Sequence, residues 1–282
     1  MRATARRILW SCVGMVAGLP LLAAAADAEF PSPVAMRELV GERLEYRIRW
    51  SGIPVGSATM EVGLGPEPWL VEMRSTADSL PVIDLIYPVE DRVVSRAVTS
   101  SLRAKSYRKV SREGPRHEHR EILFDHTNGA AGTVIDGKRI PYLPVPKDVL
   151  DPLSAIYAYR LHPAPEGNPP ELPVTDGEKL ITARMRIRGL ERVTTPAGTF
   201  DTVVVEPQIE GLGGIFRRSP NAKIHLWITR DRWRRLVKME TKVAIGSVAV
   251  ELTEVTEPTG APPPRELARD WDKWKPANAS ER

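Results

Sequence analysis

Apolar and charged residues alternate strictly in one stretch near the start of the chain, at positions 44–50. Its apolar residues are Leu44, Tyr46, Ile48 and Trp50, and all the residues between them are charged. A period of two is typical of a β-strand with one buried and one solvated face. The pattern therefore predicts a strand over 44–50 whose apolar side, including Tyr46 and Trp50, faces the core.

Similar patterns recur along the chain and predict most of the remaining secondary structure. Further strands are expected over 58–62, 89–97, 102–110, 116–124, 132–136, 183–188, 200–205, 222–229, 235–244 and 248–255. The last two strands meet at Gly246-Ser247, which suits a type II′ hairpin because glycine tolerates the first central position. Many short strands joined by tight turns favour a mainly β fold. We expect a large antiparallel, curved sheet or an open barrel of roughly a dozen strands.

One segment, 151–161, carries the signals of a helix. Asp151 can cap its N-terminus, and Pro152 suits the first helical position. The apolar residues that follow at helical spacing are Leu153, Ile156 and Tyr157. This spacing predicts one short amphipathic helix that can cover part of the sheet. A helical turn is also expected within 79–87, before Pro88.

The first 28 residues have the layout of a secretory signal peptide. Three arginines precede an apolar run, and Ala26-Asp27-Ala28 offers the small residues that a signal peptidase requires. No basic cluster follows to stop transfer, so we expect cleavage before Glu29, no remaining membrane anchor, and a periplasmic location. The mature chain then consists of one β-rich domain over 29–256. A Pro-rich, charged and flexible tail is expected over 257–282.

Cleavage also changes the composition that bears on function. The net charge falls from +4 to +2, because the leader contains three arginines and one aspartate. This balance argues against nucleic acid as a partner, since nucleic-acid binding needs a strongly cationic face. The only cysteine, Cys12, is lost with the leader, which excludes disulfides and thiol chemistry in the mature protein.

Candidate catalytic and metal-binding residues are few, and each has a simpler explanation. His117 and His119 would project from one face of a strand together with Glu121, which makes them weak candidates for metal ligands. A solvated strand face explains them equally well, with Ile122 and Phe124 on the apolar side, and we expect no metal or other cofactor. Asp84, Glu90 and Asp91 could supply a carboxylate pair, and Ser154 a nucleophile. No sequence motif supports either role.

Arginines are concentrated around Trp233, where Arg232 and Arg234 are its immediate neighbours. Guanidinium groups bind phosphate and lipid headgroups through paired hydrogen bonds. A solvated surface balanced by nearby carboxylates is the alternative that the near-neutral charge favours.

Four stretches of the chain resemble the exported bacterial proteins grouped as domain-of-unknown-function family 3108. They are 44–50 with 52–58, then 85–92, 151–157 and 195–201. Together they extend over nearly all of 41–256. The resemblance implies a β-rich periplasmic domain and supplies no established activity, so it assigns no catalytic residues.

Two classes of function remain open. The first is a non-enzymatic envelope protein whose curved sheet binds an apolar ligand, a lipid or a lipoprotein. Its groove would be lined by the helix residues Leu153, Ile156 and Tyr157 and by Tyr46 or Trp50 from the sheet, with the arginines near Trp233 meeting a headgroup. The second class comprises a hydrolase of envelope polymers or a structural adaptor without a small ligand. The sequence supplies no convergent polar site for the hydrolase, so it favours a protein that is not an enzyme.

Overall fold

The computed structural model describes residues 34–162, 169–208, 223–242 and 246–260. Over these ranges the chain forms one sheet of 15 strands, two α-helices and one 3-10 turn. The first half of the sheet consists of β1 (Arg43–Trp50), β2 (Ile53–Leu64), β3 (Leu70–Ser79), β4 (Val89–Val98), β5 (Ala104–Glu113), β6 (Arg116–Asp125), β7 (Ala130–Ile135), β8 (Lys138–Arg139) and β9 (Leu143–Pro144). The second half consists of β10 (Leu172–Thr175), β11 (Leu180–Thr195), β12 (Gly198–Gln208), β13 (Ile224–Thr229), β14 (Leu236–Lys242) and β15 (Ser247–Thr256). The helical segments are η1 (Met36–Leu39), α1 (Pro81–Asp84) and α2 (Pro152–Arg160).

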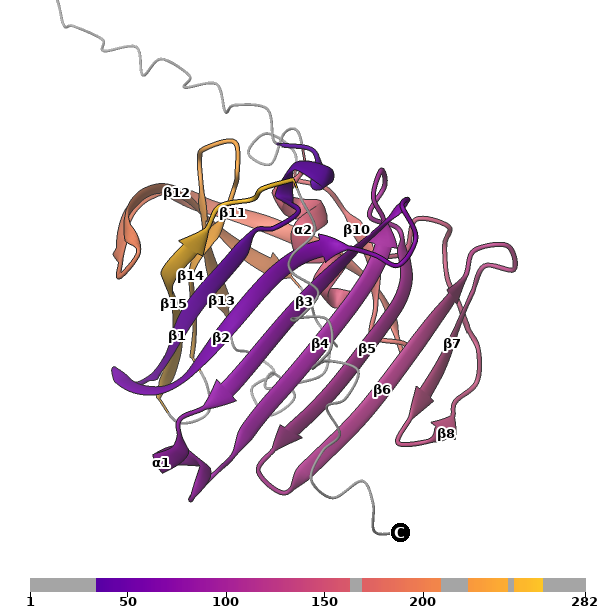
Figure 1. Cartoon of the computed structure of the whole chain (residues 1–282), viewed down its shortest axis with the longest axis horizontal. Coiled ribbons are helices and arrows are strands. Elements are labelled where there is room, and N and C mark those ends of the chain that lie inside the picture. Colours follow the sequence, from indigo (N-terminus) through magenta and orange to yellow (C-terminus); the bar gives the residue numbers. More distant parts are fainter. Residues whose placement is uncertain (1–33, 163–168, 209–222, 243–245, 261–282) are drawn as a thin grey trace, which may run out of the picture.

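Neighbouring strands of the sheet are antiparallel, and their order runs from β10 through β15, then β1, and on to β8. The first and last strands of the described ranges are therefore neighbours, with Arg47 of β1 directly opposite Glu251 of β15. In Figure 1 the strands β1–β7 form the near wall, while β10–β14 lie behind them. The two ends of the strand order, β10 and β8, are not paired with each other. The predicted large, curved and open antiparallel sheet is confirmed.

A short extended segment at residues 149 and 150 links the near wall, β1–β7, to the strands behind it, at a place where no two strands pair. The Leu150 amide donates to the Pro173 carbonyl at 2.8 Å, beside β10, and the Ala104 amide of β5 donates to the Val149 carbonyl at 3.1 Å. Side chains add to this link, since Thr133 Oγ1 of β7 donates to the Gly177 carbonyl at 3.0 Å. The sheet is thus held in its curved shape by a strap of two residues and by contacts at the β10–β11 turn.

Helix α2 begins where the sequence predicts it. The Asp151 carboxylate accepts hydrogen bonds from the backbone amides of Leu153 and Ser154, which caps the first turn. It also accepts one from Ser95 Oγ of β4 at 2.6 Å, which fixes the helix against the near wall. The helix lies behind β3 and β4 in the upper half of Figure 1. Helix α1 confirms the helical turn expected before Pro88 and lies at the opposite, lower end of the sheet.

The predicted burial of Trp50 is wrong. Leu44 and Tyr46 are buried and Ile48 is half-buried, but Trp50 at the end of the same strand is 45% exposed. The strand extends toward the lower end of the sheet, away from α2, so its last residue passes beyond the packed core. Alternation correctly identifies the inward face here, but it does not indicate how far along the strand that face is covered.

Candidate functional site

The residues predicted to line an apolar groove are packed together inside the protein. Tyr46, Leu153 and Tyr157 are buried members of one core cluster, and Ile156 is partly buried against it. The Tyr46 hydroxyl donates to the Leu236 carbonyl at 2.9 Å, and burial raises the pKa of Tyr46 well above its usual value. Helix α2 therefore fills the curved sheet at these positions. They form core rather than an open groove.

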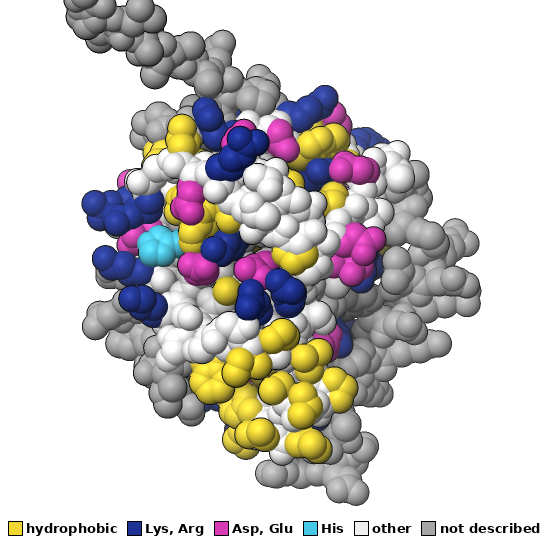
Figure 2. Space-filling model, turned by 90° about the vertical axis from the view of Figure 1, so that its left-hand side faces the viewer, with side chains coloured by type: hydrophobic (Ala, Val, Ile, Leu, Met, Phe, Trp, Pro, Cys, Tyr) yellow, Lys and Arg dark blue, Asp and Glu magenta, His cyan; other side chains and the backbone are white. Residues whose placement is uncertain are grey.

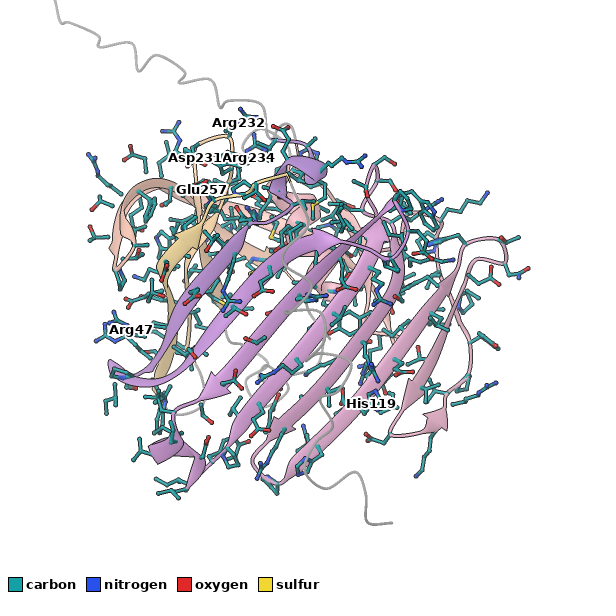
Figure 3. All side chains as sticks on the ribbon, viewed as in Figure 1. Arg47, His119, Asp231, Arg232, Arg234 and Glu257 are labelled. Atoms are coloured by element: carbon teal, nitrogen blue, oxygen red, sulfur yellow. The ribbon has the colours of Figure 1, made fainter. Side chains whose placement is uncertain are left out.

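The arginines around Trp233 also serve the fold. Asp231 accepts hydrogen bonds from the backbone amides of Trp233 and Arg234 at 2.9 and 3.0 Å, which shapes a tight turn between β13 and β14. Arg234 is buried and donates to the His162 carbonyl, whereas Arg232 is exposed and forms an ion pair with Glu38 at 2.7 Å. Figure 3 shows this turn at the upper end of the molecule. Of the two arginines predicted to meet a headgroup, only Arg232 has a side chain at the surface.

A buried ion network was not predicted from the sequence. The Glu42 carboxylate accepts from Arg160 Nη2 of α2 at 2.8 Å and from Arg235 Nε at 3.0 Å. Arg235 forms a second ion pair with Glu257, and the amides of Thr259 and Gly260 donate to the Val40 carbonyl, so the start of the predicted tail contacts the domain. Burial lowers the pKa of Arg160, but the Glu42 carboxylate together with Tyr157 and Tyr46 more than offsets this effect, so the pKa is raised. The network holds α2 against the sheet, and no local sequence motif indicates its presence.

The candidate metal ligands lie on an exposed face. Figure 3 places His119 on the near wall, on β6. His119 Nε2 accepts from Arg108 Nε at 3.3 Å and lies 3.1 Å from Glu121, so a guanidinium shares the face with both histidines. Ile122 and Phe124 are buried on the other side of the strand, as predicted. Within the described ranges there is no group of three or more metal-ligating side chains.

The three carboxylates considered for catalysis do not converge. Glu90 pairs with Arg112 at 3.6 Å, and its neighbour Asp91 points to the opposite face of β4 because successive strand residues alternate. Asp84 accepts a hydrogen bond from Ser79 outside the sheet. These residues share no cleft.

A cluster of exposed apolar side chains, which we call the apolar tip, lies at the lower end of the sheet. It consists of Trp50 and Ile53 beside the β1–β2 turn and of Leu80, Val82, Leu85, Ile86 and Tyr87 in and around α1. Val82 is 64% exposed, Leu85 87% and Ile86 83%. Figure 2 shows a contiguous apolar area at the bottom of this side of the molecule, below a region of mixed charge. Isolated exposed leucines are common, whereas a contiguous apolar cluster is typical of surfaces that contact another molecule.

Local hydrogen bonds hold α1 as a projection from the sheet. Ser79 Oγ donates to Asp84, and the Val89 amide donates to Ser79 Oγ at 2.7 Å, which pins the two strand ends together. The Leu80 amide donates to the Val55 carbonyl at 2.8 Å, which anchors the start of the loop to β2. The intervening residues extend beyond the ends of β3 and β4, so their apolar side chains have no core to pack against.

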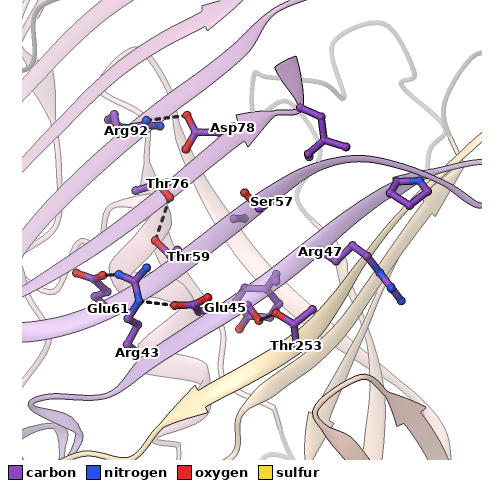
Figure 4. A pocket seen from close by; sticks show the side chains of 15 residues that line it. Arg43, Glu45, Arg47, Ser57, Thr59, Glu61, Thr76, Asp78, Arg92 and Thr253 are labelled. Carbon is purple, nitrogen blue, oxygen red and sulfur yellow. Dashed lines mark hydrogen bonds and ion pairs between the residues drawn. The ribbon is translucent and has the colours of Figure 1, made fainter. Parts of the chain in front are cut away.

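A polar hollow lies beside the apolar tip, on the outer face of β1, β2 and β3. It has a volume of about 730 Å³, and we call it the polar groove. Its lining residues are Arg43, Glu45, Tyr46, Arg47, Pro54, Gly56, Ser57, Ala58, Thr59, Glu61, Thr76, Asp78, Leu80, Arg92 and Thr253. Figure 4 shows its labelled side chains, with Arg43 between Glu45 and Glu61, and Arg92 directed at Asp78. The groove gathers residues from both ends of the chain because β15 pairs with β1.

Among the described residues, no helix combines the length and the apolar character that crossing a membrane would require.

Comparison with one solved structure supports the fold. A β-barrel-like protein of domain of unknown function DUF1849 from Brucella abortus has a TM-score of 0.52 at 10% identity, over 78% of this chain and 98% of that one. A candidate lipoprotein from Parabacteroides distasonis and a candidate exported protein with a YmcC-like fold from Bacteroides fragilis each reach a TM-score of 0.32. They are 12% and 9% identical to this chain, cover 78% and 77% of it, and are each matched over 96% of their own length.

Comparison with known sequences identifies the family. No curated protein matches this chain. The family model described as "Protein of unknown function (DUF3108)" matches residues 45–253, which include most of the sheet and α2. The chain therefore belongs to the DUF3108 family of proteins of unknown function.

Proposed function

We propose that this protein is a non-enzymatic envelope protein that binds lipid through its apolar tip. The exposure of Leu85, Ile86 and Val82 on one projecting loop carries the proposal, because water-exposed apolar side chains gain free energy when they enter an apolar phase. Burial of each such side chain contributes about 1.5–3 kcal/mol. Three of them suffice for reversible attachment to a bilayer.

The flanking aromatic residues support a lipid surface as the partner. Trp50 and Tyr87 are each 45% exposed and border the fully apolar part of the tip. Indole and phenol rings are enriched where hydrocarbon meets water, since one part of the ring system is apolar and the other forms hydrogen bonds. Arg49 precedes Trp50, and its guanidinium donates to the Gly52 carbonyl in the turn beside the tip.

The periplasmic location that we propose follows from the signal-peptide pattern at the start of the chain. Residues 1–28 lie outside the described ranges, so the signal peptide rests on its sequence pattern. We expect the protein from the periplasmic fraction to begin at Glu29, which mass spectrometry of the intact chain can establish. A chain that retains Met1, or one that carries a lipid on Cys12, would contradict export by this route.

Vesicle co-sedimentation tests the lipid-binding role. Wild-type protein (residues 29–282) is expected to partition onto neutral phosphatidylcholine vesicles, and Leu85→Glu/Ile86→Glu is expected to reduce that partitioning at least tenfold. Leu123→Glu is the matched control, because Leu123 is 69% exposed on β6, outside the apolar tip. The proposal fails if wild-type protein stays in the supernatant, or if the tip variant and the control behave alike. Binding to a lipidated protein but not to vesicles would also overturn it.

A further inference from the structure

We propose that the polar groove binds the neutral, polyhydroxylated headgroup of a lipid such as a glycolipid. The inference rests on the proposed function, because it assigns a binding site to the headgroup of the same lipid whose chains the apolar tip contacts.

The groove and the tip are continuous. Leu80 belongs to both, and Pro54 of the groove directly follows Ile53 of the tip. The Leu80–Val55 hydrogen bond fixes the two loops side by side. A lipid whose acyl chains lie against the tip therefore presents its headgroup to the lower end of the groove.

The charges of the groove favour a neutral ligand. Arg43 is paired with Glu45 at 2.8 Å and also with Glu61. On β4, Arg92 is paired with Asp78 at 2.6 Å. Arg47, the third arginine of the lining, forms an ion pair with Glu251 of β15 at 2.8 Å. The lining holds three arginines and three carboxylates, so their charges cancel and the groove offers no net attraction to an anionic headgroup. Hydroxyl groups can add hydrogen bonds to such pairs without breaking them, because guanidinium groups have five donors and carboxylates accept at several positions.

The remaining lining also suits hydroxyl groups. Thr59 and Thr76 share a hydrogen bond of 2.9 Å across β2 and β3, and each hydroxyl has further capacity to donate or accept. Ser57 stands between Arg47 on one side and Asp78 on the other, and its short side chain leaves space between two longer ones. The Ser57 hydroxyl has no hydrogen-bond partner within the described part of the chain. A volume of about 730 Å³ lies within the usual range for small-molecule sites, roughly 300–1,000 Å³, and accommodates a short sugar.

Vesicles of three compositions test this assignment: phosphatidylcholine alone, phosphatidylcholine with phosphatidylglycerol, and phosphatidylcholine with digalactosyldiacylglycerol. The digalactosyl lipid is expected to strengthen binding at least fivefold over phosphatidylcholine, and phosphatidylglycerol less than twofold. Ser57→Tyr fills the groove and should abolish the enhancement. Ser106→Tyr is the control, because Ser106 lies on the same outer face but on β5, outside the groove. A second variant, Thr59→Val/Thr76→Val, removes two hydroxyls with little change in volume and should weaken the enhancement as well.

The outcomes separate the two proposals. If wild-type protein binds all three vesicles equally, or if both groove variants keep the full enhancement, the tip binds lipid and the groove assignment is wrong. Stronger binding to phosphatidylglycerol than to the digalactosyl lipid would also overturn it, in favour of an anion site. If no vesicle binds wild-type protein, the proposed function itself fails. Thermal unfolding by circular dichroism confirms that each variant is folded before its binding is compared.

Discussion

Glu42→Gln is the substitution that most directly tests how the helix is held in the sheet. The Glu42 carboxylate is buried and faces Arg160 of α2, whose side chain is 1% exposed. Arg160 also donates to the carbonyls of Arg234 and Trp233, at 3.0 and 3.1 Å. Glutamine keeps the shape of the side chain but removes its charge. The Arg160 guanidinium would then be a buried cation held only by neutral acceptors.

The expected cost follows from this geometry. Removing one partner of a buried ion pair destabilises a protein by about 3–5 kcal/mol. Arg235 keeps its ion pair with Glu257, and Arg160 keeps its two carbonyls, so we expect the lower end, about 3 kcal/mol. For a domain of this size that corresponds to a fall in the melting temperature of about 6–12 °C.

Urea unfolding followed by circular dichroism measures the change in the free energy of unfolding. Glu38→Gln is the matched control, because Glu38 pairs with Arg232 at 2.7 Å at the surface and should cost less than about 1 kcal/mol. The double variant Glu42→Leu/Arg160→Met removes both buried charges and should recover part of the loss. Equal costs for Glu42→Gln and Glu38→Gln would refute the reasoning, as would a double variant less stable than Glu42→Gln.

Three further predictions follow from burial and charge. Burial raises the pKa of Asp91 from 3.8 to about 6. The folded state therefore binds the proton of the Asp91 carboxyl group more tightly than the unfolded chain does. The contribution of this proton to stability is present below about pH 4 and is lost as the pH rises through 6. Asp91→Asn should therefore raise the free energy of unfolding by up to about 3 kcal/mol at pH 7.5 and by less at pH 4.5, and a pH-independent effect in urea unfolding would contradict this. Tyr46→Ala should cost about 3–5 kcal/mol and Trp50→Ala less than about 1 kcal/mol in the same assay, and the reverse order would disprove the revised core boundary. Elemental analysis of untagged protein should find no stoichiometric zinc or copper; one tightly bound ion per chain, lost in His117→Ala/His119→Ala, would contradict that expectation.

The strands that the sequence reveals are those with one covered face. In β6 the buried residues Ile122 and Phe124 alternate with exposed ones, so the period of two is visible. Strand β3 was not predicted, because Leu70, Val71 and Met73 are buried together with Glu72 between them. Both faces are covered at that end of the strand, and its alternation disappears.

The candidate site depends on contacts between residues that are far apart in the sequence, and no local pattern encodes such contacts. The apolar residues of α1 are visible in the sequence, but their exposure arises because Ser79 pins the ends of β3 and β4 and leaves the loop outside the core. Likewise Arg43 and Thr253 line one groove only because β15 pairs with β1. Alternation identifies the outward face of each strand, and the order of strands decides which outward residues meet.

The pairing of the first strand with the last also constrains when the protein can fold. Arg47 and Glu251 are separated by 204 positions in the chain, yet they lie opposite each other in the middle of the sheet. Synthesis delivers the N-terminal half first, and non-local pairing of this kind is slow because a long loop must close. The seam between β15 and β1 cannot form until residue 256 is available. During the export that we propose, the sheet therefore cannot be completed until nearly all of the chain has crossed the membrane, and the edge of β1 stays unpaired until then.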